Sequence, residues 1–142
     1  MKTIIRNATI VNEGRRFIGS VVIEDETIQQ VLEGDDSTQI YDTEIDATGL
    51  YLFPGVIDDH VHFREPGLTH KADIASESRT AAAGGVTSFM DMPNTNPPTT
   101  TIELLEEKFR IAEKNSRINY SFFFGASNEN TDALVKLDRQ RI

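Results

Sequence analysis

The chain is 142 residues long and carries 14 Lys and Arg against 23 Asp and Glu, which gives a net charge of −9. A chain of this length can build one core of ordinary size, and 38% apolar with 26% charged residues is typical of a soluble globular protein. The acidic balance argues against nucleic-acid binding, and no apolar run reaches the roughly 20 residues that span a bilayer. The lack of cysteine excludes disulfides and thiolate zinc sites. Because the first residues show neither a secretory nor a transit pattern, we expect a cytoplasmic protein without nucleic-acid or membrane partners.

Residues 1–53 are predicted to form a small β-sheet module. Short β-branched runs alternate here with polar turn residues, which is the pattern of strands in a sheet. Two of the runs flank Asp25-Glu26 and indicate a hairpin, and a polar loop is expected at 34–38. The expected strands are 3–6, 9–11, 20–24, 27–32, 44–47 and 50–53.

After Pro54-Gly55 the sequence alternates between strand and helix patterns. Asp73 is the expected N-cap of one helix, which Gly84-Gly85 would end, and Thr100 with Glu103 has capping-box spacing before the next helix. Three consecutive strand–helix units predict parallel strands covered by helices, so the fold class is α/β. The expected strands are 56–60, 86–90 and 119–125, and the expected helices are 74–83, one that begins at the Thr100 cap, and 131–141.

The domain boundary is expected where this pattern changes, between a β segment at 1–53 and an α/β segment at 54–142. A (β/α)₈ barrel needs about 250 residues, so only the first three β-α units of a barrel fit in this chain. The chain is therefore expected to be an incomplete part of such a barrel protein. A complete three-stranded α/β domain is the alternative.

The strongest chemical signal is the run from Asp58 to Arg64, which contains His60 and His62 at the end of an apolar strand. Residues two apart in a strand face the same side, with Cα atoms roughly 6.6 Å apart. Two imidazoles placed this way can converge on one cation at Zn–N distances of about 2.0–2.1 Å. The C-terminal edge of parallel strands is also where ligands bind in α/β folds. The alternative to a metal site is that the two histidines at the strand end only contact carboxylates. Their position in one tripeptide flanked by acidic residues favours the metal site.

Three further polar residues are expected at the same rim. Asp58 lies two residues before His60 and is a candidate to orient a metal-bound histidine. Arg64 offers a planar guanidinium suited to a carboxylate or phosphate and is a candidate substrate anchor, with a salt bridge to Glu65 as the alternative. Asn94 follows the second strand of the α/β segment, and its amide can donate to an anionic substrate, although Asn in Pro-Asn-Thr is ordinarily a turn residue.

These motifs carry a resemblance to a known family. Residues 58–67, Asp-Asp-His-Val-His-Phe-Arg-Glu-Pro-Gly, resemble the first-strand motif of the amidohydrolase superfamily, and the variant with Arg and Glu-Pro-Gly is similar to the dihydroorotases. The likeness continues through 69–76, 81–87 and 92–97. It covers the whole chain loosely and 54–98 closely.

The fold that the resemblance implies is a metal-dependent (β/α)₈ barrel with a small β-sandwich, to which residues 1–53 would contribute. His60 and His62 match zinc ligands, with one or two ions in a complete subunit, and Arg64 and Asn94 match the groups that hold a substrate carboxylate. The other ligands and the general base would lie downstream, so no catalytic residue is expected in this chain. The implied reaction is the reversible hydrolysis of dihydroorotate, a carboxylate-bearing cyclic amide, to N-carbamoyl-aspartate in pyrimidine biosynthesis.

The sequence leaves other functions open. An allantoinase or a dihydropyrimidinase is a related cyclic amidohydrolase, and an uncharged ring would not need Arg64 as a cationic clamp. A non-catalytic amidohydrolase-like subunit would keep the barrel as a scaffold for assembly. The sequence does not fix the oligomeric state, with a homo-oligomer among the options, nor the number of metal ions or the direction of the reaction.

Overall fold

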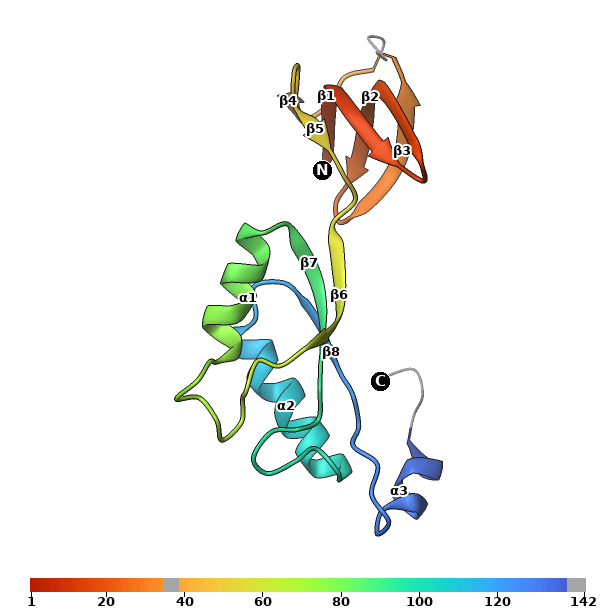
Figure 1. The fold of residues 1–142 in the computed structure, drawn as a ribbon. Coiled ribbons are helices and arrows are strands. Elements are labelled where there is room, and N and C mark those ends of the chain that lie inside the picture. The colour runs from red at the N-terminus through yellow and green to blue at the C-terminus, as the bar shows by residue number, and fades with distance from the viewer. Residues whose placement is uncertain (35–38, 138–142) are drawn as a thin grey trace. The chain divides into compact units, whose positions relative to one another are not determined.

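The computed structural model describes residues 1–34 and 39–137 (Figure 1). The chain divides into two compact units, Met1–Pro54 and Gly55–Ile142, and each unit has its own hydrophobic core. The expected loop residues 35–38 and the expected helical residues 138–141 lie outside the described part. No helix within that part combines the length and the apolar character needed to cross a membrane.

The first unit is a single mixed sheet of five strands. β1 is the central strand, because β2 and β4 flank it on either side and β5 also pairs with it. The β1–β2 and β2–β3 pairs are antiparallel, whereas β4 and β5 run parallel to β1. The strands are β1 (Lys2–Asn12), β2 (Arg15–Glu24), β3 (Thr27–Glu33), β4 (Thr43–Asp46) and β5 (Tyr51–Leu52).

The structure joins the two short strands that the sequence predicted at 3–6 and 9–11. They form one strand, β1, with a break in register between Ile5 and Ala8, where Asn7 takes a left-handed φ of 60°. Asn tolerates that conformation, so the chain can bulge without ending the strand. The hairpin about Asp25-Glu26 is confirmed as the β2–β3 turn.

The second unit alternates strands and helices, as the sequence predicted. Its three strands form a parallel sheet in the order β6-β7-β8, and α1 and α2 pack against each other and against this sheet (Figure 1). The α/β class is therefore confirmed. The elements are β6 (Val56–Val61), α1 (Ile74–Ala83), β7 (Val86–Asp91), α2 (Ile102–Asn115), β8 (Asn119–Phe122) and α3 (Thr131–Lys136).

The core of this unit lies between the helices and β7 and β8. Phe89 of β7 and Phe122 of β8 are fully enclosed, and their ring centroids are 6.3 Å apart. The prediction that helices cover the parallel strands, and so bury them, is wrong for β6, because Val56 and Ile57 are 53% and 68% exposed. The physical reason is position: within the described residues β6 is an edge strand that pairs with β7 alone, and α1 and α2 lie on β7 and β8.

Both main helices begin at side-chain caps. The Asp73 carboxylate accepts a hydrogen bond from the Ser76 main-chain N–H at 2.7 Å, which confirms Asp73 as the N-cap of α1. The α2 cap is Thr101 rather than the expected Thr100, because Thr101 is the last extended residue and its hydroxyl accepts from the Leu104 N–H. Thr100 instead belongs to the preceding turn, where its N–H donates to the Pro98 carbonyl oxygen.

Replacing the α1 cap is expected to make stability depend less on pH. The hydrogen bonds from Ser76 hold the pKa of Asp73 below its ordinary value. Because the folded pKa is lowered, this carboxylate stabilises the fold above its unfolded pKa, and that contribution is lost as the pH falls through the folded pKa. Asp73→Ala should lower Tm by a few degrees at pH 7 and by less in acid. Asp73→Asn keeps a cap without a charge and is the control; thermal unfolding at several pH values gives the comparison.

Candidate metal and substrate site

The two predicted metal ligands lie side by side at the C-terminal end of β6. His60 is the second-to-last residue of β6, and His62 follows directly after Val61, the last one. Their ring centroids are 5.3 Å apart with an angle of 61° between the ring planes. Both side chains are exposed, whereas the neighbouring Phe63 is buried in the core. Phe63 therefore packs in the core, and the two imidazoles lie outside it.

The chain brings His62 together with Asn94 from the loop after β7. The Nδ1 atom of His62 lies 2.8 Å from Oδ1 of Asn94. An amide oxygen can only accept, so Nδ1 carries the proton in this arrangement. A neutral imidazole protonated at Nδ1 keeps the lone pair of Nε2 for a ligand. With this contact, Nε2 is the His62 nitrogen that is left to bind a ligand.

This donor set suits part of a zinc site. Two adjacent neutral imidazoles are ordinary zinc ligands, and a catalytic zinc usually has three protein ligands. Across residues 1–34 and 39–137 no cluster of three or more His, Cys, Asp or Glu side chains forms a metal site. His60 and His62 fit a divalent cation, and further ligands from outside the described residues would have to complete its coordination.

Asp58 contacts His60 through the main chain rather than the ring. Its Oδ1 accepts from the His60 main-chain N–H at 3.3 Å. This contact restrains the backbone that carries the imidazole. Asp59 is exposed at the same strand end.

Arg64 lies beyond the strand that carries His60. β6 ends at Val61, and Arg64 takes a left-handed φ of 66°, so the alternation of the strand does not extend to it. The expected alternative partner, Glu65, is already in use, because its Oε2 accepts from the Ile74 N–H at the start of α1 at 2.9 Å. Among the described residues the half-buried guanidinium of Arg64 makes no ion pair. A cation held in this way is available to an anionic ligand.

The loops that carry Arg64 and Asn94 are locked together. The Asn96 N–H donates to the Pro66 carbonyl oxygen at 3.2 Å. Gly67 has a φ of 81°, and a Cβ atom at this position would collide with the main-chain carbonyl of Asn96. Glycine is required here both for the backbone conformation and for the close approach of the second loop. The Glu-Pro-Gly turn therefore positions one loop against the other.

A buried ion pair that was not predicted from the sequence lies next to the residues of this rim. The Nζ atom of Lys108 in α2 donates to Oδ2 of Asp91, the last residue of β7, at 2.6 Å, and the two side chains are 0% and 1% exposed. Burial lowers the pKa of Lys108, and the Asp91 carboxylate opposes that shift. Helical spacing carried a signal for this, because Lys108 lies three residues after Leu105 and four before Ala112, on the buried side of α2.

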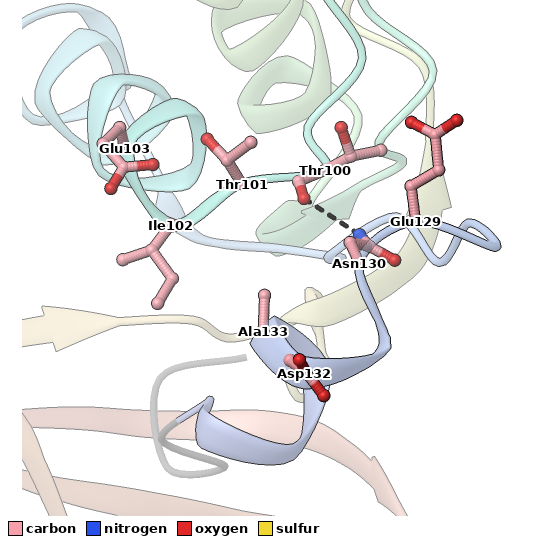
Figure 2. Close-up of a pocket in the computed structure, with 8 residues that line it drawn as sticks. All are labelled: Thr100, Thr101, Ile102, Glu103, Glu129, Asn130, Asp132 and Ala133. Carbon is pink, nitrogen blue, oxygen red and sulfur yellow. Dashed lines mark hydrogen bonds between the residues drawn. The ribbon is translucent and has the colours of Figure 1, made fainter.

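An open hollow of about 350 Å³ lies at the starts of α2 and α3, and none of the predicted site residues lines it (Figure 2). The Asn130 amide donates to the carbonyl oxygens of Thr100 at 2.9 Å and of Gly125 at 2.8 Å, which ties the two loops beside the hollow together. Its charged lining is acidic, namely Glu103, Glu129 and Asp132. An acidic lining does not suit the carboxylate-bearing substrate expected from the sequence.

Comparison with known proteins identifies the family. The model of the amidohydrolase family matches residues 51–142. A dihydroorotase from Lactobacillus acidophilus is 38% identical over 135 residues, covering 95% of this chain and 31% of that protein. An allantoinase from Deinococcus radiodurans is 46% identical over 94 residues, covering 66% of this chain and 21% of that protein. The solved structure of L-hydantoinase (dihydropyrimidinase) from Arthrobacter aurescens matches with a TM-score of 0.88 and 28% identity, over 94% of this chain and 30% of that one.

The chain belongs to the amidohydrolase family, and it is related to the cyclic amidohydrolases. The predicted resemblance is thereby confirmed. Its mixed sheet and parallel β-α units match the N-terminal part of the hydantoinase fold. The chain spans 31% of the length of the dihydroorotase from Lactobacillus acidophilus.

Proposed function

We propose that this chain is the N-terminal part of a zinc-dependent dihydroorotase, which interconverts dihydroorotate and N-carbamoyl-aspartate. The observation that carries the proposal is an Arg64 guanidinium that makes no ion pair with any described residue and lies two residues after a pair of adjacent imidazoles, with Asn94 in contact with one of them. The similarity to a dihydroorotase over 95% of the chain supports the same assignment. The resemblance assigns that reaction to pyrimidine biosynthesis, and we propose a cytoplasmic enzyme with one or two zinc ions per complete subunit.

His60 and His62 would hold the cation, and Asp58 would steady the strand end that carries them. A bound zinc ion supplies hydroxide at neutral pH and polarises a carbonyl. The hydrogen bond that Nδ1–H of His62 donates to Oδ1 of Asn94 keeps the proton on Nδ1, so that Nε2 would be free to bind the ion. Without the downstream ligands and general base, the 142-residue chain by itself is expected to be inactive.

Arg64 and Asn94 would bind the substrate carboxylate. A guanidinium forms two parallel hydrogen bonds to a carboxylate, which fixes both the position and the rotation of the ring that bears it. The Asn94 amide can add an N–H donor while its oxygen faces His62, because one amide provides both groups. Asn94 would then link the substrate to a metal ligand.

A hydantoinase, dihydropyrimidinase or allantoinase activity is the second candidate. It is favoured by the TM-score of 0.88 to the L-hydantoinase structure and by the 46% identity to the allantoinase. Arg64 separates the candidates, because a ring without a carboxylate offers no partner for this cation. A non-catalytic scaffold subunit would bind no zinc and hydrolyse none of these rings.

The test is a side-by-side assay of the full-length protein that contains this segment. We expect its zinc content to be at least one ion per subunit by elemental analysis, and its kcat/KM to be highest for dihydroorotate when compared with dihydrouracil, hydantoin and allantoin. Preference for an uncharged ring would move the assignment to the second candidate. Absence of both zinc and hydrolysis would leave the scaffold role.

A further inference from the structure

Asp91 joins three elements directly beneath the candidate site. Its Oδ1 accepts from the Phe63 main-chain N–H at 2.8 Å, and its carbonyl oxygen accepts from the Phe123 N–H at 3.0 Å. Its Oδ2 accepts from Lys108. One residue at the end of β7 therefore holds the chain after β6, the chain after β8 and helix α2.

Lys108 fixes the other side of this junction. Its Nζ also donates to the Met92 carbonyl oxygen at 3.0 Å and lies 4.8 Å from the centre of the Phe122 ring. Met92 is hydrogen-bonded in turn to Val61, since its N–H donates to the Val61 carbonyl oxygen at 3.0 Å. The ammonium thus has two oxygen partners and an aromatic face, and water has no access to it.

These contacts surround the two backbone segments that carry site residues. Phe63 is the residue after His62, and Met92 is two residues before Asn94. A shift of either segment would move one partner of the 2.8 Å contact between His62 and Asn94. A rigid, fully buried ion pair is well suited to prevent such a shift, because its two charges are costly to separate.

We propose that the Asp91–Lys108 pair positions His62 and Asn94, and so sets the affinity of the site for its cation. The pair touches neither the expected metal nor the substrate, so both members are positioning residues. This inference rests on the proposed function for its metal readout. Neither Asp91 nor Lys108 belongs to the predicted metal ligands, His60 and His62.

The experiment compares two neutral replacements of the pair in the full-length protein. Asp91→Asn with Lys108→Met keeps an oxygen that can accept from the Phe63 N–H, whereas Asp91→Leu with Lys108→Met removes it. Neither double variant leaves a lone buried charge, so both avoid the main cause of misfolding. The single variant Lys108→Met leaves Asp91 buried without its cation. Leu105→Ala, on the same helix face, is the control for a general loss of stability.

Two measurements separate positioning from stability. The first is the zinc dissociation constant, measured by chelator competition well below Tm. We expect this constant to be about 10- to 100-fold larger in Lys108→Met and in the leucine double variant. That is the range seen when residues that support metal ligands are changed. The second is the long-range ¹H–¹⁵N NMR spectrum of the metal-free protein, which reports whether Nδ1 of His62 carries the proton. The same variants should lose the Nδ1–H form that Asn94 selects.

Leu105→Ala is expected to match wild type in both measurements, even where it lowers Tm as much as Lys108→Met. The asparagine double variant keeps an acceptor for the Phe63 N–H but lacks the ion pair and the bond from Lys108 to Met92, so its zinc affinity is expected to lie between those of wild type and the leucine double variant. Wild-type zinc affinity and a wild-type His62 spectrum in both double variants would overturn the proposal, as would a Leu105→Ala variant that binds zinc as weakly as Lys108→Met. A wild-type protein without zinc affinity would refute the proposed function instead. The NMR comparison would then still decide whether the pair positions His62.

Discussion

Replacement of either His60 or His62 by alanine is expected to remove zinc from the full-length protein and to lower kcat at least about 10³-fold, a loss of about 4 kcal/mol in transition-state stabilisation. The two imidazoles are adjacent and exposed at the end of β6. Loss of one from a three-ligand site leaves too few protein ligands to retain a catalytic zinc. Elemental analysis after dialysis and the initial rate on dihydroorotate give the two readouts.

His70→Ala is the matched control for this prediction. His70 is the third histidine of the chain and is exposed in the loop before α1. Its removal changes the histidine count without touching the candidate ligands, and it should leave zinc content and rate unchanged. Full zinc content in both His60→Ala and His62→Ala would contradict the assignment of these residues as ligands.

Arg64→Met is expected to lower kcat/KM for dihydroorotate by about 100-fold, equivalent to about 2.7 kcal/mol, while leaving hydrolysis of an uncharged ring nearly unchanged. The guanidinium is half-buried and has no acidic partner within the described residues, so the loss should fall on substrate binding rather than on stability. Methionine retains the length of the side chain without its charge. Steady-state kinetics on dihydroorotate and dihydrouracil check the split.

Arg64→Lys and Arg79→Met complete the Arg64 series. Lysine keeps the charge but lacks the planar pair of donors, so it should recover only part of the lost kcat/KM. Arg79 lies exposed on α1, and its replacement removes the same charge from the protein without changing the site. Equal losses on the charged and the uncharged ring in Arg64→Met would show that Arg64 does not recognise a carboxylate.

The fold could be predicted from local patterns wherever one rule dominated. Asp73 and Gly84-Gly85 bound α1 as expected, because caps depend on the chemistry of a few neighbouring residues. The exposure of β6 could not be predicted, since an apolar strand looks the same whether it lies in the centre or at the edge of a sheet. The start of α2 was misplaced by one residue, because Thr100 and Thr101 are both capable caps.

In the candidate site, too, features set by neighbouring residues could be predicted, whereas features set by tertiary packing could not. The His60–His62 pair followed from strand spacing alone, and their rings are indeed adjacent. The left-handed conformation of Arg64 follows from how its loop packs, which strand alternation does not encode. The burial of Lys108 was not predicted, because a lysine nearly always lies on the solvent-exposed side of a helix. Its pairing with Asp91, 17 residues earlier, explains the burial.

The interlock between Gly67 and Asn96 has a consequence for protein engineering. Where two loops share a main-chain contact with no room for a side chain, neither can be exchanged alone without disturbing the other. In a library that varies only the Arg64 loop, many variants would therefore fail to pack against the Asn94 loop, and they would be lost before selection on any new substrate. Changes in specificity should be sought by grafting both loops as a pair from one donor enzyme.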